Sequence, residues 1–539
     1  MSNNKLLRDL TFQARFVHIY GYDQDYYNFI LKYREKWQKS LFYIEEKLIA
    51  EEVRNGGLAS RVFKTIEDKD LNISDPELKS IDRSEFTSGF REQFDLTIQK
   101  GLSETTKQLK IAESVQLNGI VSRNAVVLNA GGQITSMKWL PRPLDDDSAL
   151  YHYLAVSVIY NPSGVSDSII HPELSVYHKN RGSNQIKSAI QLWRYDLNDN
   201  NLELEKLYIT TGIGATSNLD WLPIHILGNE STIGVLVGTF TDGKLHLFKV
   251  SHNDPETSEV INSSREYVGW SNSDFKTTDY TNITTFDFLG HDKLLVGLID
   301  GCLAEYVLPY HKSIDAEDDI RIPSSIMRIG DSSISALMVA EVEKDDYLIY
   351  VNTTGSSSLT YTYKNFIQGR AIPLLRALNK PSINPTLKMF VTANSIDAIA
   401  YNFYTRPHDT VNTLLKNEFY FTVTKLSEIL GHPLNITGTT GGDIVIMNYT
   451  RKFLLNGKTT NKATVPLNLW NVSSENNQLK LSADYLEVPS ESSIQQQVTP
   501  PETIISTLAW NENVTGSSVY TAGTIGGLLI LERLDPAFA

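Results

Sequence analysis

An internal repeat constrains the fold of this chain more than any other feature. Each copy has Ser or Thr at its second position, followed by alternating apolar residues that end in a large anchor such as Trp139 or Trp221. Alternation with a period of two is typical of a β-strand with one buried face. The copies stand at residues 134–139, 216–221, 283–288, 334–339 and 505–510. Because repeated units bury their apolar faces against their neighbours, the sequence predicts a ring or array of β units.

Each copy is followed by two apolar β-rich runs, several of which are joined by a tight-turn dipeptide. Asp-Gly or Gly-Gly supplies the positive φ that such a hairpin needs. These pairs stand at 242–243, 300–301, 441–442 and 526–527. A strand with a large anchor, followed by a hairpin, is the pattern of a WD40-type β-propeller blade.

With a weaker run at 389–401, the repeats add up to a seven-bladed WD40-type β-propeller in the all-β class, carrying an N-terminal helical extension. Residues 124–128 are predicted to pair with the last blade, which closes the ring and removes exposed strand edges. We therefore divide the chain into an extension and linker at 1–123 and a propeller at 124–539. Residues 57–120, polar and acidic with weak periodicity, are interpreted as a loosely helical linker.

The N-terminal region contains a helical pattern instead. Large apolar residues recur every three or four positions from Tyr26 onward, which places them on one stripe of an α-helix. Asp23 is its predicted N-cap. This stripe forms a candidate docking helix whose central residues are Tyr33, Trp37 and Leu41. Two partners fit it, the chain's own propeller or another subunit.

Charge and cysteine content exclude several classes of protein. The chain has 49 Lys and Arg against 63 Asp and Glu, a net charge of −14, which disfavours DNA binding through overall charge. Its single cysteine, Cys302, excludes an intrachain disulfide and a Cys-based zinc site. No apolar run reaches the ~18 residues of a membrane span, and no secretory signal precedes the helix. We expect an intracellular protein that makes no membrane contact.

Motifs for catalysis do not emerge from the sequence. The run Gly212-Ile-Gly214 precedes a predicted strand and lacks a third glycine, so it reads as a loop and not as a dinucleotide site. There is no phosphate-binding Gly-Lys-Ser/Thr, no His-Glu-x-x-His and no Gly-x-Ser-x-Gly motif. We therefore predict no enzyme activity, no cofactor, no metal and no small-molecule substrate.

Two acid-free runs interrupt the acidic background, one from Tyr347 to Ile396 and one from Ile444 up to Glu475. If they lie in neighbouring blades, their cations suit a phosphate backbone or an acidic partner surface. Chance gaps with cations that point several ways are the alternative. The candidate DNA or partner contacts are Lys364, Arg370, Arg376, Lys380, Lys388, Arg451, Lys452, Lys458 and Lys462.

The order of several motifs resembles the β-propeller subunit of the RNA polymerase III transcription factor TFIIIC. These are the Gly-Gly-x-Ile-x-Ser-x-x-Trp opening at 131–139, Ile-Gln-Leu-Trp at 190–193, the run 234–245, and Leu-Ala-Trp-Asn at 508–511 followed by Gly-Gly-Leu at 526–528. The resemblance covers roughly residues 124–535. The helical segment of that family is matched only loosely by residues 15–55.

The resemblance implies a non-enzymatic nuclear subunit that pairs with a second β-propeller subunit and with other TFIIIC subunits. That module, the fungal tau-B module, recognises the B-box promoter of tRNA genes, so promoter DNA would be reached through the complex. Yeast members are similar in having a basic N-terminal extension, and this chain starts almost at the helical region, which puts tail-mediated DNA contact in doubt. The alternative is a WD40 scaffold for chromatin or ubiquitin-ligase assembly.

Overall fold

The structure is a computed structural model of the chain. It describes residues 12–39, 64–71, 73, 77–82, 90–143, 151–160, 187–227, 232–252, 257–263, 265–267, 269–270, 280–308, 322–343, 346–355, 357–372, 375, 379–394, 398–409, 412–417, 419–428, 433–450, 465–476, 478–488 and 499–534. Among the helices in these ranges, none is long and apolar enough to cross a membrane.

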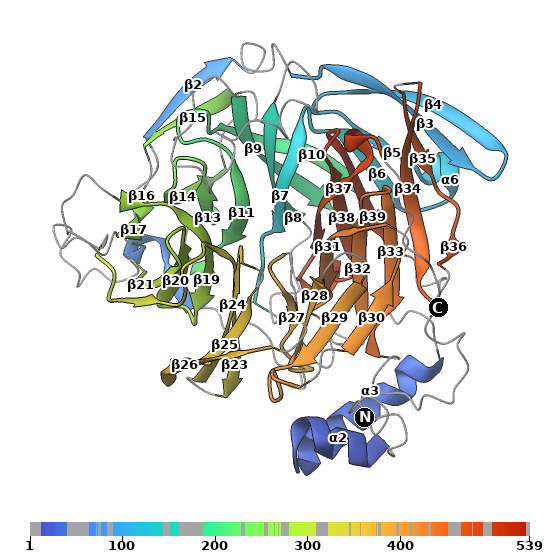
Figure 1. Cartoon of the computed structure of the whole chain (residues 1–539). Helices are drawn as coiled ribbons and strands as arrows, with labels where there is room; N and C mark the ends of the chain where they lie inside the picture. The colour runs from blue at the N-terminus through green and yellow to red at the C-terminus, as the bar shows by residue number, and fades with distance from the viewer. Residues whose placement is uncertain are drawn as a thin grey trace.

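The chain forms an all-β propeller, with antiparallel sheets side by side in a ring (Figure 1). Six blades each take four strands from one stretch of chain. Their inner strands are β7 (Gln133–Trp139), β11 (Thr216–Trp221), β19 (Ile283–Leu289), β23 (Ile334–Glu343), β27 (Ser382–Asn384) and β31 (Phe421–Leu426). Neighbouring blades contact one another mainly through these inner strands.

The outer strands of the six blades complete the sheets in the same order. They are β8 (Tyr151–Tyr160), β9 (Lys187–Asp196) and β10 (Asn201–Ile209); β13 (Thr232–Phe240), β14 (Leu245–Ser251) and β16 (Arg265–Tyr267); β20 (Lys293–Leu298), β21 (Cys302–Val307) and β22 (Ser325–Arg328); β24 (Asp346–Thr353), β25 (Ser358–Thr362) and β26 (Asn365–Ala371); β28 (Met389–Asn394), β29 (Ala398–Phe403) and β30 (Asn412–Lys416); β32 (Leu434–Thr439), β33 (Asp443–Asn448) and β34 (Leu467–Glu475).

An antiparallel sheet built from both ends of the propeller closes the ring. It joins β37 (Ile505–Trp510), β38 (Val519–Thr524) and β39 (Leu528–Arg533) to β6 (Ala125–Asn129) and β5 (Ser114–Gln116). The antiparallel pairing of β6 with β39 confirms the predicted closure by residues 124–128. The prediction of a seven-bladed propeller is wrong in its count: the structure has six blades, each contiguous in the sequence, and the closing sheet takes strands from both sides of them.

The hairpin chemistry is confirmed in the strands and turns. Gly243, Gly301, Gly442 and Gly527 all have positive φ, between 81° and 88°, as their turns require. The Trp anchors of the repeat are buried, with Trp139 and Trp221 fully inaccessible to solvent. The repeat pattern in the sequence thus predicted both the geometry of these turns and the buried anchors of the inner strands.

Residues 64–121 are not the loosely helical linker that we expected. They contain β1 (Lys64–Glu67), β2 (Glu77–Asp82), β3 (Gln93–Lys100) and β4 (Ser103–Lys110), besides β5 and the short helices η1 (Asp68–Asp70) and α6 (Asn118–Val121). β3 alternates exposed and buried positions along its length, a period-two pattern that the prediction missed. The division of the chain at residue 124 stays a prediction.

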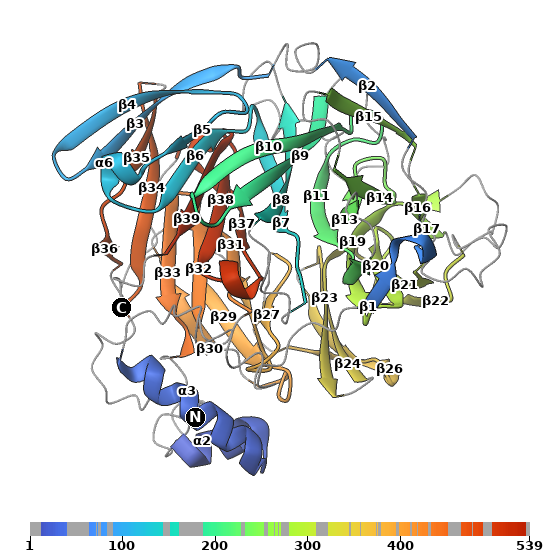
Figure 2. The ribbon, with the colours of Figure 1, turned by 180° about the vertical axis from the view of Figure 1, so that it is seen from behind.

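These early strands extend sheets of the propeller. β1 pairs in parallel with β12 (Ile224–Leu227), β2 pairs with β15 (Thr257–Ser263) beside β10, and β3 pairs in parallel with β35 (Gln478–Ser482) beside β34. The remaining strands and 3-10 helices are β17 (Gly269–Trp270), β18 (Tyr280–Thr281), β36 (Leu486–Glu487), η4 (Pro501–Thr503) and η5 (Val514–Gly516). Seen from behind, β3 and β4 lie across the closing side of the ring (Figure 2).

Hydrogen bonds at the second repeat position join successive blades. Thr135 Oγ1 donates to the carbonyl of Thr216 in the next blade (2.6 Å). Equivalent bonds run from Thr284 to Ile334 (2.5 Å), from Thr422 to Ile505 (2.5 Å) and from Ser506 back to Ile134 (2.6 Å). The Ser or Thr of the repeat therefore serves as a link between blades, and we call these bonds the inter-blade girdle.

A buried ion pair fixes the closing sheet. The guanidinium of Arg123, just before β6, binds Glu532 of β39 through two hydrogen bonds of 2.7 and 2.6 Å. Both side chains are almost fully buried, at 4% and 1% exposure. Arg123 also lies over the Trp470 ring at 3.6 Å, and Tyr520 donates a hydrogen bond to the same carboxylate. The surrounding donors and acceptors satisfy both charges where the two ends of the ring meet.

Removing one partner of this pair is expected to destabilise the protein strongly. Arg123→Met leaves the Glu532 carboxylate buried without its cation, which costs about 3–5 kcal/mol of unfolding free energy. Denaturant unfolding followed by circular dichroism measures the loss. The double variant with Glu532→Gln should recover part of it. The matched exposed pair supplies the control: Arg328→Ala removes the contact to Asp331 and should change little, because both side chains are more than half exposed. Equal stability of Arg123→Met and wild type would contradict the closing role.

Candidate functional site

The N-terminal helices dock on the chain's own propeller. Helix α2 (Phe12–Tyr20) and helix α3 (Gln24–Lys39) lie at one end of the ring, beside the blade that holds β29 and β30 (Figure 1). Asp23 Oδ1 accepts a hydrogen bond from the Tyr26 amide (2.9 Å), which confirms the predicted N-cap. Ile30 and Tyr33 are buried against residues of β28 and β29, including Met389 and Phe403.

Polar contacts hold the same interface. Tyr20 Oη donates to the Leu387 carbonyl (2.9 Å), and Tyr26 Oη donates to the carbonyl of Thr386, both in the turn between β27 and β28. Lys388 ends that turn, and its ammonium lies 5.7 Å from the centre of the Tyr26 ring. Burial raises the pKa of Tyr26. Of the candidate docking residues, Tyr33 is placed at this interface, whereas the Trp37 side chain and Leu41 lie outside the described residues.

The docking contact can be tested at its most buried aliphatic residue. Ile30 is fully buried, so Ile30→Ala should lower the free energy of helix undocking by about 2–5 kcal/mol. Hydrogen exchange of the α3 amides reports undocking directly, and the variant should exchange faster there while the blade strands keep their protection. The control variant is Tyr22→Ala, which changes a side chain that is 96% exposed and should leave exchange unchanged. Unchanged α3 exchange in Ile30→Ala would remove the packing argument.

Four of the nine predicted cations lie among the described residues, so their gathering on one surface stays a prediction. Lys364 lies in the turn before β26 and Arg370 near the far end of that strand, both exposed. Six residues along a strand span about 20 Å, so these two cations sit near opposite ends of the blade. Arg376, Arg451, Lys452, Lys458 and Lys462 lie outside the described residues.

The other two predicted cations have partners within the fold. Lys380 forms an ion pair with Asp287 of β19 (3.4 Å) and donates to the Phe286 carbonyl (3.1 Å). Lys388 is half-buried beside the helices, as described above. Lys380 is therefore an interior contact across the ring, and reversing its charge would break that contact rather than change an outer face.

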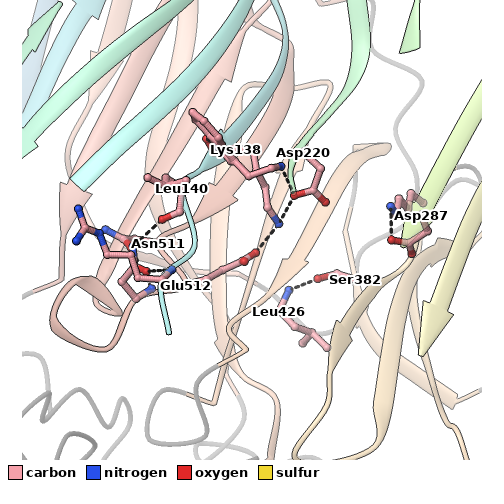
Figure 3. Close-up of polar contacts among 12 residues, drawn as sticks. Lys138, Leu140, Asp220, Asp287, Ser382, Leu426, Asn511 and Glu512 are labelled. Atoms are coloured by element: carbon pink, nitrogen blue, oxygen red, sulfur yellow. Dashed lines mark hydrogen bonds and ion pairs between the residues drawn. The ribbon is translucent and has the colours of Figure 1, made fainter. Parts of the chain in front are cut away.

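Charged side chains gather where the inner strands end, a feature that the sequence analysis missed. Lys138 of β7 binds Glu512, two residues past β37, at 2.6 Å, and Asp220 of β11 at 3.6 Å (Figure 3). Lys425 occupies the equivalent penultimate position of β31. Together with Lys380 and Asp287, these side chains form a set of charges near the ends of inner strands that we call the charged mouth. A sequence pattern could have predicted this set. A charged residue stands three positions after the Ser or Thr of the girdle position in four inner strands, at Lys138, Asp220, Asp287 and Lys425.

Lys425 differs from its neighbours. Within the part of the chain that the structure describes, no acidic group forms an ion pair with its ammonium, although the other two lysines of the mouth each have one. Burial, together with the charges of Lys138 and Lys380, lowers the pKa of Lys425 to about 8, against the opposing effects of Glu512 and Asp220. This lysine therefore lacks sufficient compensation for its charge.

The lowered pKa predicts a pH-dependent stability. Because the unfolded chain binds the Lys425 proton up to a pKa near 10.5 and the folded chain only up to about 8, stability rises with pH between these values. At pH 7, where the charged form is buried against Lys138 and Lys380 despite Glu512 and Asp220, Lys425→Met should be more stable than wild type. The difference should shrink as the pH approaches 10.

Denaturant unfolding at pH 7 and pH 9.5 measures this difference. The exposed Lys364→Met is the matched control and should follow the wild-type pH dependence. If the difference in unfolding free energy between Lys425→Met and wild type is the same at both pH values, the charge of Lys425 is not destabilised by burial.

Metal and catalytic chemistry find no support in the described ranges. Among those residues, no group of three or more His, Cys, Asp and Glu side chains could hold a metal ion. Cys302 is buried. His246, which the sequence places within a blade, contacts Asp242 at 2.9 Å in the hairpin of β13 and β14, where it joins strand to turn. The most distinctive charged feature among the described residues is therefore the charged mouth.

These features place the chain among the β-propeller proteins, and the comparisons give a more particular relationship. No family model matches the sequence. The chain is similar to the transcription factor tau 91 kDa subunit of Saccharomyces cerevisiae (strain ATCC 204508 / S288c), with 24% identity over 574 residues, covering 98% of this chain and 77% of the yeast protein. That relative is a subunit of a transcription factor and not an enzyme. The similarity and the propeller together confirm the expected relationship to the TFIIIC propeller subunit.

Proposed function

We propose that this chain is a non-enzymatic, WD40-type propeller subunit of TFIIIC that acts in the nucleus. The similarity to the tau 91 kDa subunit carries this proposal, because it spans 98% of the chain and so includes the N-terminal helices as well as the ring. In this function the chain pairs with a second propeller subunit and supports recognition of B-box promoter DNA at tRNA genes. The remaining TFIIIC subunits are its further partners.

The charge of the chain favours DNA contact through the complex and not by this subunit alone. A net charge of −14 opposes the backbone attraction that supplies most non-specific affinity for DNA. The isolated chain should therefore bind duplex DNA weakly and without preference for a B-box. Two exposed cations, Lys364 and Arg370, are the described candidates for contacts made within the assembled complex.

Affinity purification tests the assignment directly. The tagged full chain is recovered from a nuclear extract of its own source and its partners are identified by mass spectrometry. We expect TFIIIC subunits, including a second propeller protein. Recovery of ubiquitin-ligase or chromatin subunits in their place would overturn the proposal. The Tyr22→Ala variant, altered at an exposed position, should recover the same partners as wild type.

Charge reversal tests the DNA contact within the complex. Lys364→Glu and Arg370→Glu are measured separately, because the two residues lie far apart along the blade. Each lost phosphate contact should lower the slope of log affinity against log salt by about 1. Binding of the complex to a B-box duplex across a salt series gives that slope. The exposed Lys107→Glu in β4 is the control. Unchanged slopes for both reversals would exclude these residues from the DNA interface.

A further inference from the structure

Strand β4 ends the sheet that contains β31 to β35 and β3. It pairs with β3 and with no other strand among the described residues. Its eight residues make it the longest described strand at the outer end of any sheet. The hairpin of β3 and β4 lies at the periphery of the molecule (Figure 2). Because an edge strand presents unpaired N–H and C=O groups, β4 is a place where another chain can extend the sheet.

The pairing with β3 fixes the direction of the backbone groups of β4. A two-residue loop joins the strands, so Lys100 and Ser103 form the first hydrogen-bonded pair of the ladder. Hydrogen-bonded and non-hydrogen-bonded pairs then alternate along the strands. The odd-numbered residues of β4 therefore bond to β3, and the backbone groups of residues 104, 106 and 108 face away from it. The same alternation directs the Gln99 carbonyl toward β35, where it accepts a hydrogen bond from the Ala483 amide (2.9 Å).

The outward groups are exposed and unpaired. Glu104, Thr106 and Gln108 all have exposed side chains, and no described residue forms a hydrogen bond with their outward N–H and C=O groups. The hydroxyl of Thr106 contacts that of Thr97 (3.2 Å), which is a contact within the hairpin. Three alternate residues thus present the donors and acceptors that one further strand would use.

The charges beside this edge favour an acidic strand. Glu104 is already bound by Lys480 of β35 (2.8 Å). Lys107 is exposed and has no ion pair among the described residues, and Lys110 has only a long contact to Glu113 (4.0 Å). Lysine on an edge strand discourages pairing with other strands, whereas opposite charges on facing strands stabilise the pair. The edge is therefore protected against neutral and basic strands and open to an acidic one.

We propose that the free edge of β4 is a strand-addition site for an extended acidic segment of a partner protein. The backbone of that segment pairs with Glu104, Thr106 and Gln108, and one of its carboxylates lies opposite Lys107. Strand addition of this kind takes its affinity from main-chain hydrogen bonds and its specificity from side chains. A second copy of this chain fits less well, because its own β4 would bring Lys107 in place of an acid.

The site does not depend on the TFIIIC assignment, because it rests on the backbone and charges of this chain. Lys107 meets a carboxylate and not a phosphate there, so its reversal still leaves the salt slope of DNA binding unchanged.

Hydrogen exchange on the full wild-type chain gives the first test. The probe is a short peptide of alternating Thr and Glu, and exchange is read at single residues by mass spectrometry. In the free protein the amides of Glu104, Thr106 and Gln108 should exchange quickly, while those of Thr105 and Lys107 are protected by β3. The peptide should slow exchange at the three outward amides. Outward amides that are already protected in the free protein, or that the peptide leaves unchanged, would overturn the site.

Binding of the fluorescein-labelled peptide separates backbone pairing from charge. Thr106→Pro removes one outward N–H without touching the bonds to β3, and it should weaken binding by about threefold to tenfold, as for one lost hydrogen bond. The matched control is Thr106→Val, which also loses the hydroxyl contact to Thr97 but keeps the N–H and should bind as wild type does. The same peptide with alternate amides N-methylated keeps every carboxylate and should not bind. Equal binding of the methylated peptide would leave attraction between charges alone and end the proposal.

Charge specificity and the competing occupant complete the test. Lys107→Gln should weaken the acidic peptide by up to about fivefold, as for one exposed ion pair. A peptide of alternating Thr and Gln should bind wild type more weakly than the acidic peptide does. Sedimentation of the free chain should show a monomer. Self-association that Thr106→Pro abolishes would make a second copy the occupant and refute the acidic segment.

Discussion

The ring depends on directional hydrogen bonds between blades, and one of them recurs at four blade boundaries. Thr135, Thr284, Thr422 and Ser506 all donate to a backbone carbonyl of the following blade. The antiparallel ladder within each blade does not make this connection. Apolar packing between blades is non-directional, so the girdle, together with bonds such as that from Trp510 Nε1 to the Lys425 carbonyl, sets how far these inner strands lie along their neighbours.

A local distortion makes that bond possible. The pairing of each of these inner strands shifts register beside the donor, as between Ile134 and Ser136 and between Phe421 and Val423. The same shift occurs at the matching point of β11, β19, β23 and β37. A bulge re-aims a side chain that a regular strand would point elsewhere. The repeat in the sequence is thus a repeat of strand, bulge and donor, which is why Ser and Thr recur where an apolar residue would otherwise suit a buried strand.

The same distortion brings charges together at the charged mouth. Lys138, Asp287 and Lys425 each stand three residues after a girdle donor, so the bulge and the shared register place them at one level of the ring. Met338 and Ala509 occupy the equivalent positions of two other inner strands and contribute no charge. Glu512 and Lys380 instead reach the mouth from outside their strands. The mouth therefore follows from the girdle, although its particular charges do not.

Much of the fold could be predicted from local patterns in the sequence. The anchors, the glycine turns, the N-cap at Asp23 and the closing pairing of residues 124–128 were all predictable, because each depends on neighbours along the chain or on a repeat. The strands β1 and β2 were not recognised, since their partners β12 and β15 stand more than a hundred residues away. β3 and β4 form a local hairpin whose period-two pattern was missed, and β3 also pairs with the distant β35. The interior contact of Lys380 was not foreseen either, because it depends on Asp287 in a different blade.

Closure of the ring determines when the charged residues of the mouth come together during folding. β6 pairs with β39, β3 pairs with β35, and Arg123 binds Glu532, so the segment around residues 93–129 is tied to the last blades of the chain. Contacts of such high sequence separation form late in folding, because their loop-closure entropy has to be overcome first. The charged mouth takes residues from blades on both sides of this closure, including Lys138 and Glu512. The ion pair between these two side chains requires the ring to be closed, so the mouth is complete only in the folded chain.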